Sequence, residues 1–367
     1  MLYDVIVVGG GPSGCAASKR SAELGLDTLM VDNKIEIGSP LRDYEILSRN
    51  SLERMGVETE KHWMDRTLRE VRIFVDEASA SIILDDMEFY SVEMDKFEKH
   101  LAALSSQAGA EIQIKTEAIS PLLDSGSITG VKLRTGQTVR DEKCRAVIFA
   151  GGLDSSFMRN TPQLGITKGE RVARSFQHRV VGNFENRSSI DIYLGRDVRS
   201  LYAVIPKADS IANIIAIGLD DGFDPVQSIS AFIENTMNIG NWGSLQIASA
   251  EINRTGDPEK LGMPGMLVTG DSAGVNSGCW ATGIENAYVS GMIAAETLNQ
   301  MLVSEAFNLI TEYERKIGDL SRGTNNKGIV DIITGLNSLT LKNRLKSGSN
   351  FHFRGNGNFS DILGSVL

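Results

Sequence analysis

The chain has 367 residues, 41% of them hydrophobic and 23% charged, a composition typical of a globular protein large enough for two joined domains. Its formal net charge of −10 argues against nucleic acid as a partner, because a phosphate backbone binds to basic surfaces. Cys15, Cys144 and Cys279 are too widely spaced to predict a disulfide framework, an iron–sulfur cluster or another metal site. No apolar run approaches the ~18 residues of a membrane span, so we expect a cytoplasmic protein with at most peripheral membrane contact.

The start of the chain carries its most informative pattern. An apolar run, Tyr3–Val8, leads into Gly9-Gly10-Gly11-Pro12-Ser13-Gly14, which predicts a buried strand, a tight turn and a helix start. The helix is expected to reach about Leu24, and a second strand over 28–31 ends at Asp32. Such glycines permit a sharp turn, the approach of a pyrophosphate and close helix packing, and a carboxylate at the second strand's tip can accept both ribose hydroxyls. Strand, glycines, helix and acid in this order predict a dinucleotide site.

Several elements are expected between the N-terminal unit and the strand at which the chain re-enters the first domain. Two runs rich in β-branched residues, Val71–Val75 and Ser81–Leu84, predict a hairpin. Apolar residues recur at helical spacing from Met94 onward and predict an amphipathic helix over 94–108 that ends at Gly109. Strands are then expected at 110–115, 128–133 and 146–150, the last of them apolar enough to be buried and parallel.

A second layer is expected in the middle of the chain. Four consecutive strand candidates lie at 175–181, 190–194, 201–205 and 213–219. Strands that follow one another without helices predict an antiparallel sheet, which we interpret as a substrate platform. Helices are expected at 228–239, 284–301 and 307–320.

Two later segments suit a flavin. The strand 264–271 ends in Gly270-Asp271, and an acid at that place can hydrogen-bond the ribityl chain. The following helix begins near Gly283 and Ile284, whose amides would stabilise the negative charge of a reduced flavin if they point at its ring. A third segment, the buried strand that ends at Ala150 and Gly151, would let a cofactor lie against its backbone.

Together these segments resemble the flavoprotein superfamily typified by p-hydroxybenzoate hydroxylase and, within it, the geranylgeranyl reductases of isoprenoid lipid synthesis. The resemblance rests on residues 3–14, on Glu36–Pro40, on the helical segment FEKHLAA from Phe97 to Ala103, and on LVTGDSAGVNSGCWATGIENAYVSGMIAAE from Leu267 to Glu296. It implies FAD as the cofactor. The expected cofactor-binding residues are Gly9, Gly11, Pro12, Ser13, Gly14, Asp32, Asn33, Arg42, Ala150, Gly151, Gly270, Asp271, Gly283 and Ile284.

The sequence departs from the geranylgeranyl reductases beside the expected flavin and on the substrate sheet. Arg42-Asp43-Tyr44-Glu45-Ile46 stands where many of them carry Arg-Cys-Ala-Glu-Gly, so the active-site cysteine of the family is absent. Leu201–Pro206 keeps the proline of their Tyr-x-Trp-x-Phe-Pro motif without its large aromatic residues. The expected catalytic residues are Arg42, Tyr44, Cys279 and Trp280. The scattered histidines His62, His100, His178 and His352 are expected to be non-catalytic, and no metal site is predicted.

The resemblance implies an α/β fold with a Rossmann-like FAD-binding domain of the glutathione reductase type. An inserted antiparallel sheet would form the substrate domain, and a helical segment would end the chain. We predict 1–60, 94–165 and 255–303 for the FAD-binding domain, 61–93 and 166–254 for the substrate domain, and 304–367 for the C-terminal segment.

The implied activity is an FAD-dependent oxidoreductase that reduces carbon–carbon double bonds of an isoprenoid lipid or a related apolar substrate. The sequence shows no second glycine turn, so the expected electron donor is NAD(P)H that docks transiently or a ferredoxin-like carrier. Two alternatives stay open. One is an FAD-dependent monooxygenase of the same superfamily, which oxygen uptake coupled to hydroxylation would identify. The other is a non-catalytic flavin-binding or electron-transfer protein, which turnover with a small acceptor would exclude.

Overall fold

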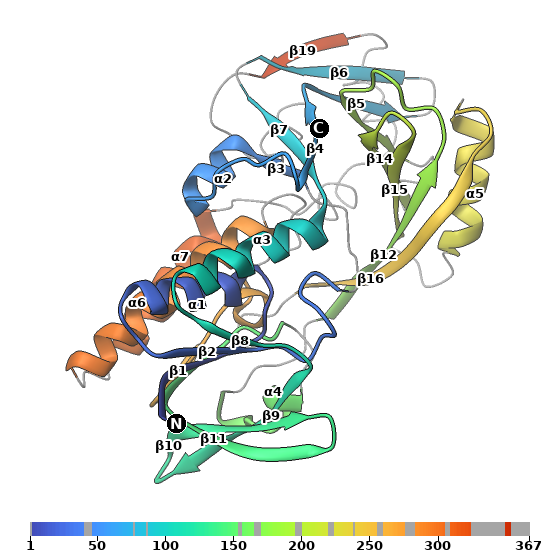
Figure 1. The fold of residues 1–367 in the computed structure, drawn as a ribbon. Helices are drawn as coiled ribbons and strands as arrows, with labels where there is room; N and C mark the ends of the chain where they lie inside the picture. Colours follow the sequence, from blue (N-terminus) through green and yellow to red (C-terminus); the bar gives the residue numbers. More distant parts are fainter. Residues whose placement is uncertain are drawn as a thin grey trace.

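The computed structural model describes most of the chain and forms three β-sheets within the described residues (Figure 1). These residues are 2–39, 46–75, 78–85, 87–152, 156–164, 170–194, 200–218, 224–237, 239–254, 260–275, 283–304, 309–323 and 349–353. Among the helices in these ranges, none combines the length and the hydropathy that crossing a lipid bilayer requires.

The first sheet is built around the N-terminal strand. Its strand order is β17 (Gly262–Met263), β18 (Met266–Val268), β11 (Thr138–Phe149), β1 (Leu2–Val8), β2 (Thr28–Val31) and β8 (Glu111–Gln113). Val5, Ile6 and Val7 of β1 are fully buried, as expected for a parallel strand that is covered on both faces. Because β1 runs parallel to β2 and β11, and β11 runs parallel to β18, the carboxyl ends of these four strands meet at one edge.

Helices cover one face of this sheet, and a β-hairpin lies on the other (Figure 1). The covering helices are α1 (Pro12–Glu23), α3 (Met94–Gln107), α6 (Gly283–Ser304) and α7 (Leu309–Gly323). The hairpin consists of β9 (Thr116–Asp124) and β10 (Ser127–Thr135), and β10 pairs with β11. The predicted helix over 94–108 is confirmed: Phe97 and Leu101 are buried in the core, and Gly109 follows with φ +110°.

The second sheet contains the antiparallel layer expected in the middle of the chain, although the sheet as a whole is mixed, because two of its strand pairs are parallel. Its strand order is β16 (Gly243–Arg254), β12 (Glu170–Val181), β15 (Ile211–Gly218), β14 (Ser200–Ala208), β13 (Ser189–Leu194), β5 (Glu70–Val75), β6 (Ala78–Leu84) and β19 (Ser349–Phe353). The predicted hairpin is β5–β6. Helix α5 (Pro225–Thr236) covers one face, where Ile229 and Ile233 pack with Val204 and Ile214 of the sheet.

The remaining described elements are short. The third sheet has the order β3 (Ile46–Ser48), β7 (Phe89–Val92) and β4 (Met64–Leu68). Helix α2 (Arg49–Met55) follows β3, and helix α4 (Ser156–Arg159) and a 3-10 turn (Pro162–Leu164) follow β11.

Two ion pairs join the second sheet to the third sheet and to Glu93, the residue that follows β7. Lys207 of β14 is 3% exposed; its ammonium group donates to the carbonyl of Val92 and lies 3.0 Å from Oδ2 of Asp65. Arg179 of β12 donates to both carboxylate oxygens of Glu93, at 3.0 and 3.1 Å. Charged groups are costly to bury unless they are paired, so these contacts determine how the two sheets meet.

The half-buried Asp65 carboxyl predicts a specific pH dependence of stability. Burial, and secondarily the nearby Glu93, raise the pKa of Asp65 to about 6, although Lys207 opposes the shift. The folded protein then holds a proton that the unfolded chain releases near its ordinary pKa of 3.8. The contribution of Asp65 to the free energy of unfolding is therefore largest below that value and falls as the pH rises through about 6.

Urea unfolding of wild type and of the Asp65→Asn variant across this pH range measures the effect. We expect wild type to lose stability relative to the variant as the pH rises from 3.8 to about 6. A constant difference between the two proteins across the range would contradict the assignment.

Three of the strands that the sequence analysis did not anticipate, β9, β16 and β19, have a common cause. β9, β16 and β19 contain polar or exposed residues at many positions, and in β16 Leu245 and Ile247 are 55% and 50% exposed. Strands of this kind are stabilised by pairing with a partner far away in sequence, so their hydrophobic pattern is weak. The C-terminal segment consequently contains β19 in addition to the expected helix α7.

Candidate functional site

The carboxyl edge of the first sheet brings the predicted glycine turn against the end of β11. Gly9 has φ +106°, and a side chain there would overlap the carbonyl group of Ala150. The amide of Ala150 donates to the carbonyl oxygen of Val8 at 2.8 Å. A Cβ atom at Gly14 would overlap the carbonyl oxygen of Gly9, so α1 starts as close to the turn as its backbone allows. The segments at Gly9 and Ala150, separated by 141 residues in the sequence, therefore form one backbone surface.

The start of α1 leaves room and hydrogen-bond donors for an anion. Gly11 is the N-cap residue, its backbone is extended, and no side chain caps the helix. A Cβ atom at Gly11 would have no heavy atom within 4 Å, so the space in front of this residue is open. Pro12 occupies the first turn, where a missing amide proton costs nothing. Uncapped amides that face open space at a helix N-terminus fit the pyrophosphate of a dinucleotide.

Asp32 stands at the carboxyl end of β2, next to the glycine turn. The residue is 5% exposed. Its Oδ2 accepts a hydrogen bond from the amide of Gly10 at 2.6 Å, and its Oδ1 accepts one from the amide of Lys34 at 2.8 Å. A carboxylate can accept about four hydrogen bonds, so two positions are left for the two hydroxyls of a ribose. The carboxylate is thus oriented by the backbone that would also hold the phosphates.

The end of β18 lies against the start of α1. A 3-10 turn, Gly270–Ala273, follows β18, and a Cβ atom at Gly270 would lie 2.9 Å from the Cβ of Ser13. Asp271, the next residue, is half-buried. The hydroxyl of Ser272 donates to the carbonyl oxygen of Gly152 at 2.5 Å and joins this turn to the end of β11. The predicted Gly-Asp strand end and the N-terminal glycine turn therefore lie side by side.

A chain of hydroxyl groups holds this junction together. Ser13 donates to the hydroxyl of Thr269 at 3.1 Å, and Thr269 donates to the hydroxyl of Ser290 on α6 at 2.9 Å. Ser290 also accepts from the amide of Gly270 at 3.1 Å and donates to the carbonyl oxygen of Ala287. Sequence analysis missed Thr269 and Ser290 as positioning residues, because their role depends on contacts between three separate elements.

Removing the Ser290 hydroxyl is expected to loosen this junction. In Ser290→Ala the amide of Gly270 and the hydroxyl of Thr269 lose a buried acceptor, which costs about 1–3 kcal/mol of unfolding free energy. We also expect weaker FAD binding, because Gly270 precedes Asp271. Urea unfolding and FAD titration of the apoprotein measure the two effects. Ser304→Ala is the matched control, because the exposed Ser304 bonds only within its own helix; equal behaviour of both variants would contradict the expectation.

Helix α6 begins at Gly283, as the sequence analysis expects. Ile284 is 6% exposed and belongs to the hydrophobic core cluster that contains the strands of the first sheet. Glu285 in the first turn is buried, and its carboxylate lies 2.6 Å from a guanidinium nitrogen of Arg54 on α2. A negative charge in the first turn stabilises a helix, and the ion pair orients the N-terminus of α6 against α2.

The structure brings most of the predicted cofactor residues to one edge of the first sheet. Located there are Gly9, Gly11, Pro12, Ser13, Gly14, Asp32, Ala150, Gly151, Gly270 and Asp271. Asn33 is exposed, one residue beyond Asp32. Arg42, Tyr44, Cys279 and Trp280 lie outside the described residues, so their predicted catalytic roles, and that of Arg42 in cofactor binding, stay predictions.

The chain is similar in sequence and in fold to known FAD-dependent proteins. A family model described as FAD dependent oxidoreductase matches residues 4–153. The digeranylgeranylglycerophospholipid reductase of Thermoplasma acidophilum is 30% identical over 329 residues, which cover 86% of this chain and 83% of that protein. The crystal structure of a geranylgeranyl bacteriochlorophyll reductase-like protein from the same organism has a TM-score of 0.85 at 28% identity and covers 94% of this chain and 90% of that chain. A myxobacterial chondrochloren halogenase, 18% identical with a TM-score of 0.70 over 86% of this chain and 79% of that chain, shows the fold alone.

The cofactor and the family follow from these findings. The family model spans the glycine turn, Asp32 and the end of β11, and the same residues provide the open helix N-terminus and the oriented carboxylate that a dinucleotide requires. The protein is accordingly an FAD-dependent oxidoreductase. Because the similarity to the Thermoplasma reductase extends over most of both chains, the chain belongs to the digeranylgeranylglycerophospholipid reductase family.

Proposed function

We propose that this protein reduces carbon–carbon double bonds in the isoprenoid chains of a lipid. The observation that carries the proposal is an FAD-type site at the edge of the first sheet in a chain that is 30% identical to a digeranylgeranylglycerophospholipid reductase. FAD, when bound, would supply the hydride for such a reduction. The contribution of the protein is to orient cofactor and substrate and to exclude water.

The cofactor half of the proposal assigns roles to residues of this chain. The amides at the start of α1 would bind the pyrophosphate, and Asp32 would accept the ribose hydroxyls. Asp271 would accept hydroxyls of the ribityl chain, and the amides of Gly283 and Ile284 would face the flavin ring. We assign Asn33, Arg42, Ala150 and Gly151 to the same site. These assignments are consistent with the hydroxyl chain that holds α1, β18 and α6 together.

An apolar face of the second sheet supports the proposal that the substrate is an isoprenoid lipid. Side chains alternate along a strand, and Val204 and Ile214 point toward α5. Their neighbours therefore lie on the opposite face. Asn213, beside Ile214, is polar and accepts a hydrogen bond from Arg179, but five aliphatic side chains of this face are each at most 2% exposed. They are Ala203, Ile205, Ile215 and Ile217, with Ile192 of β13 paired beside Ala203. A face made of short aliphatic side chains, without the large aromatic residues of the reductase motif, suits a flexible hydrocarbon chain.

Several finer assignments belong to the same proposal. We propose the domain boundaries given above, with the first sheet in the FAD-binding domain and the second in the substrate domain. Arg42, Tyr44, Cys279 and Trp280 are proposed to contact the reacting groups. The electron donor is proposed to be NAD(P)H or a ferredoxin-like carrier, and contact with the membrane to be at most peripheral.

Anaerobic turnover tests the function directly. The purified holoenzyme is reduced with dithionite and mixed with a geranylgeranyl glycerophospholipid dispersed in detergent, while flavin absorbance is followed. We expect faster flavin reoxidation with the lipid than with detergent alone, together with a mass gain of one H₂ per reduced double bond. Equal reoxidation rates and an unchanged lipid mass would refute the proposal.

The same preparation distinguishes the monooxygenase alternative. In air, a monooxygenase would consume oxygen in proportion to hydroxylated product, whereas a reductase would consume oxygen only through uncoupled oxidation of its flavin. Oxygen uptake that matches hydroxylation of any substrate in a panel of small aromatic compounds would replace the proposed function. If neither the geranylgeranyl lipid nor any compound of the aromatic panel is turned over, a non-catalytic flavin-binding protein would be favoured.

A further inference from the structure

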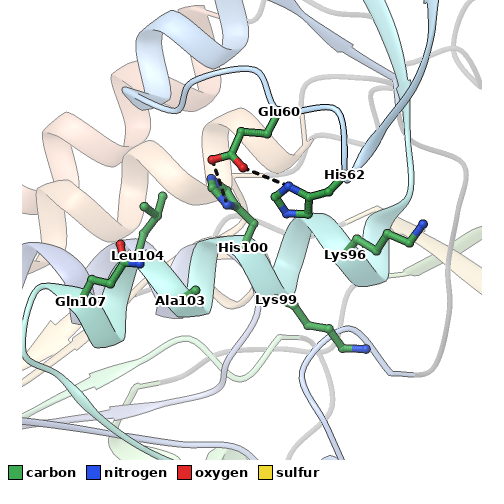
Figure 2. A pocket seen from close by; sticks show the side chains of 8 residues that line it. All are labelled: Glu60, His62, Lys96, Lys99, His100, Ala103, Leu104 and Gln107. Atoms are coloured by element: carbon green, nitrogen blue, oxygen red, sulfur yellow. Dashed lines mark ion pairs between the residues drawn. The ribbon is translucent and has the colours of Figure 1, made fainter.

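Two histidines and a glutamate from distant parts of the sequence meet at the outer face of α3. Glu60 and His62 lie on the loop between α2 and β4, and His100 lies on α3. Nδ1 of His62 is 2.9 Å from one carboxylate oxygen of Glu60, and Nδ1 of His100 is 3.6 Å from the other. The two imidazole rings are in edge contact, with their centroids 5.4 Å apart. Figure 2 shows the carboxylate between the rings. All three residues line a cavity of about 440 Å³.

The backbone on both sides of this cluster is well anchored. The amides of Trp63 and Met64 donate to the carbonyl oxygen of Glu60, which forms a turn and presents its side chain toward α3. Trp63 is fully buried and packs edge-on against Phe97, one turn before His100, with centroids 4.8 Å apart. The loop therefore cannot move away from α3 without exposing a tryptophan, and the three side chains are held near one another.

We propose that Glu60, His62 and His100 form a binding site for a divalent transition-metal ion of the Zn²⁺ class. One ligand atom from each residue lies within 4.8 Å of the other two. Around a zinc ion with bonds of about 2.0–2.1 Å, neighbouring ligand atoms of a tetrahedron lie roughly 3.3 Å apart, so the most distant pair of ligand atoms needs to close by at most about 1.5 Å. The exposed Glu60 and His62 have the freedom to do so.

The donor set determines which ions fit. Two imidazole nitrogens and one carboxylate oxygen suit Zn²⁺, Co²⁺, Ni²⁺ and Cu²⁺, whereas Mg²⁺ and Ca²⁺ require mainly oxygen ligands. A solvent molecule would complete the tetrahedron on the open side.

The lysines at the cavity do not oppose this assignment. The ammonium groups of Lys96 and Lys99 point away from the cluster in Figure 2. Lys99 is paired with Glu36 at 3.1 Å and lies 3.8 Å from Asp95. The carboxylate of Glu60 is the group that faces both histidines, so the centre of the cluster attracts a cation rather than an anion.

A bound ion would link the α2–β4 loop to a helix that supports the nucleotide site. The backbone of α3 at Asp95 lies directly against Gly38, where a Cβ atom would be 2.6 Å from the Cα of Asp95. Lys34, two residues beyond Asp32, pairs with Glu98 of α3 at 3.9 Å. The ion would therefore stabilise the folded protein and hold α3 in place, without contact to the expected position of FAD.

Metal titration of the tag-free holoenzyme tests the proposal. After dialysis against a chelator, calorimetry with ZnCl₂ is expected to show one site with a Kd in the micromolar range or below, and thermal unfolding to shift upward with added Zn²⁺. Co²⁺ should give the intense visible absorption of a tetrahedral site. His62→Ala and Glu60→Gln, both at exposed positions, are each expected to weaken binding at least tenfold and leave the FAD content unchanged.

Matched variants make the outcome decisive. His352→Ala removes an exposed histidine that is paired with Asp85 far from the cluster, and we expect it to bind Zn²⁺ like wild type. Zn²⁺ binding that is equal in all variants, or absent from wild type, would overturn the proposal. Stabilisation by inorganic phosphate in place of Zn²⁺ would also overturn it, because the lysines would then define an anion site.

Discussion

Gly14→Ala is expected to yield a protein that no longer retains FAD and is less stable than wild type. The added methyl group would overlap the carbonyl oxygen of Gly9, which itself lies against Ala150. Neither backbone segment can move freely, because β1 and β11 are paired in the core of the first sheet. Overpacking of this kind costs about 3 kcal/mol at the upper end of its usual range. Flavin absorbance of the purified protein and urea unfolding measure the two losses.

Gly11→Ala separates cofactor binding from folding. Nothing lies within 4 Å of a Cβ atom at this position, and the backbone has φ −78° and ψ −175°, which alanine adopts readily. The apoprotein should therefore match wild type within about 0.5 kcal/mol. FAD binding should weaken at least about tenfold, or about 1.4 kcal/mol, because the methyl group fills the space that the pyrophosphate would occupy.

Gly243→Ala is the control for both glycine variants. Gly243 also has open space at its Cβ position, but it begins β16 on the second sheet. We expect wild-type stability and wild-type FAD affinity. If Gly11→Ala bound FAD as tightly as Gly243→Ala, the pyrophosphate would not approach the turn at Gly11, and the arrangement proposed for the cofactor would be wrong.

Lys207→Met is expected to lower the free energy of unfolding by about 3–5 kcal/mol. The side chain is almost completely buried, and it neutralises Asp65 and donates to the carbonyl oxygen of Val92. Methionine has a similar shape but leaves the carboxylate without its cation and the carbonyl without its donor. The contact between the second and third sheets should weaken first, which hydrogen exchange at β4 and β14 would detect.

A double variant tests whether the loss comes from the unpaired charge. Asp65→Asn combined with Lys207→Met removes both charges, and we expect it to be more stable than Lys207→Met alone. Lys132→Met provides the matched control. Lys132 forms an ion pair of 2.6 Å with Asp141, but both side chains are well exposed, so the loss should be below about 1 kcal/mol. Equal losses in the Lys207 and Lys132 variants would show that burial does not determine the cost.

The structure of the proposed nucleotide-binding unit could be predicted because its signals are local. Strand β1, the glycine turn, helix α1 and Asp32 follow one another within 32 residues, and each position has a steric or hydrogen-bonding reason that depends on its neighbours. The sequence signals of the helix that begins at Met94 and of the β5–β6 hairpin are also local, because each depends on residues close together in the chain. Edge strands such as β16 escaped prediction, because their pairing partners are distant and their outward side chains are exposed.

The sequence by itself determined the cofactor class, the strand–turn–helix unit that we propose binds it, and the presence of a second layer of antiparallel strands. Only the tertiary structure decided that Thr269 and Ser290 join three elements beside the glycine turn, that Lys207 and Asp65 meet in the interior, and that His62 and His100 share a carboxylate. The physical reason is the range of the interactions. Backbone propensity and steric demand act between near neighbours, whereas burial, ion pairing and ligand geometry arise from residues that folding brings together.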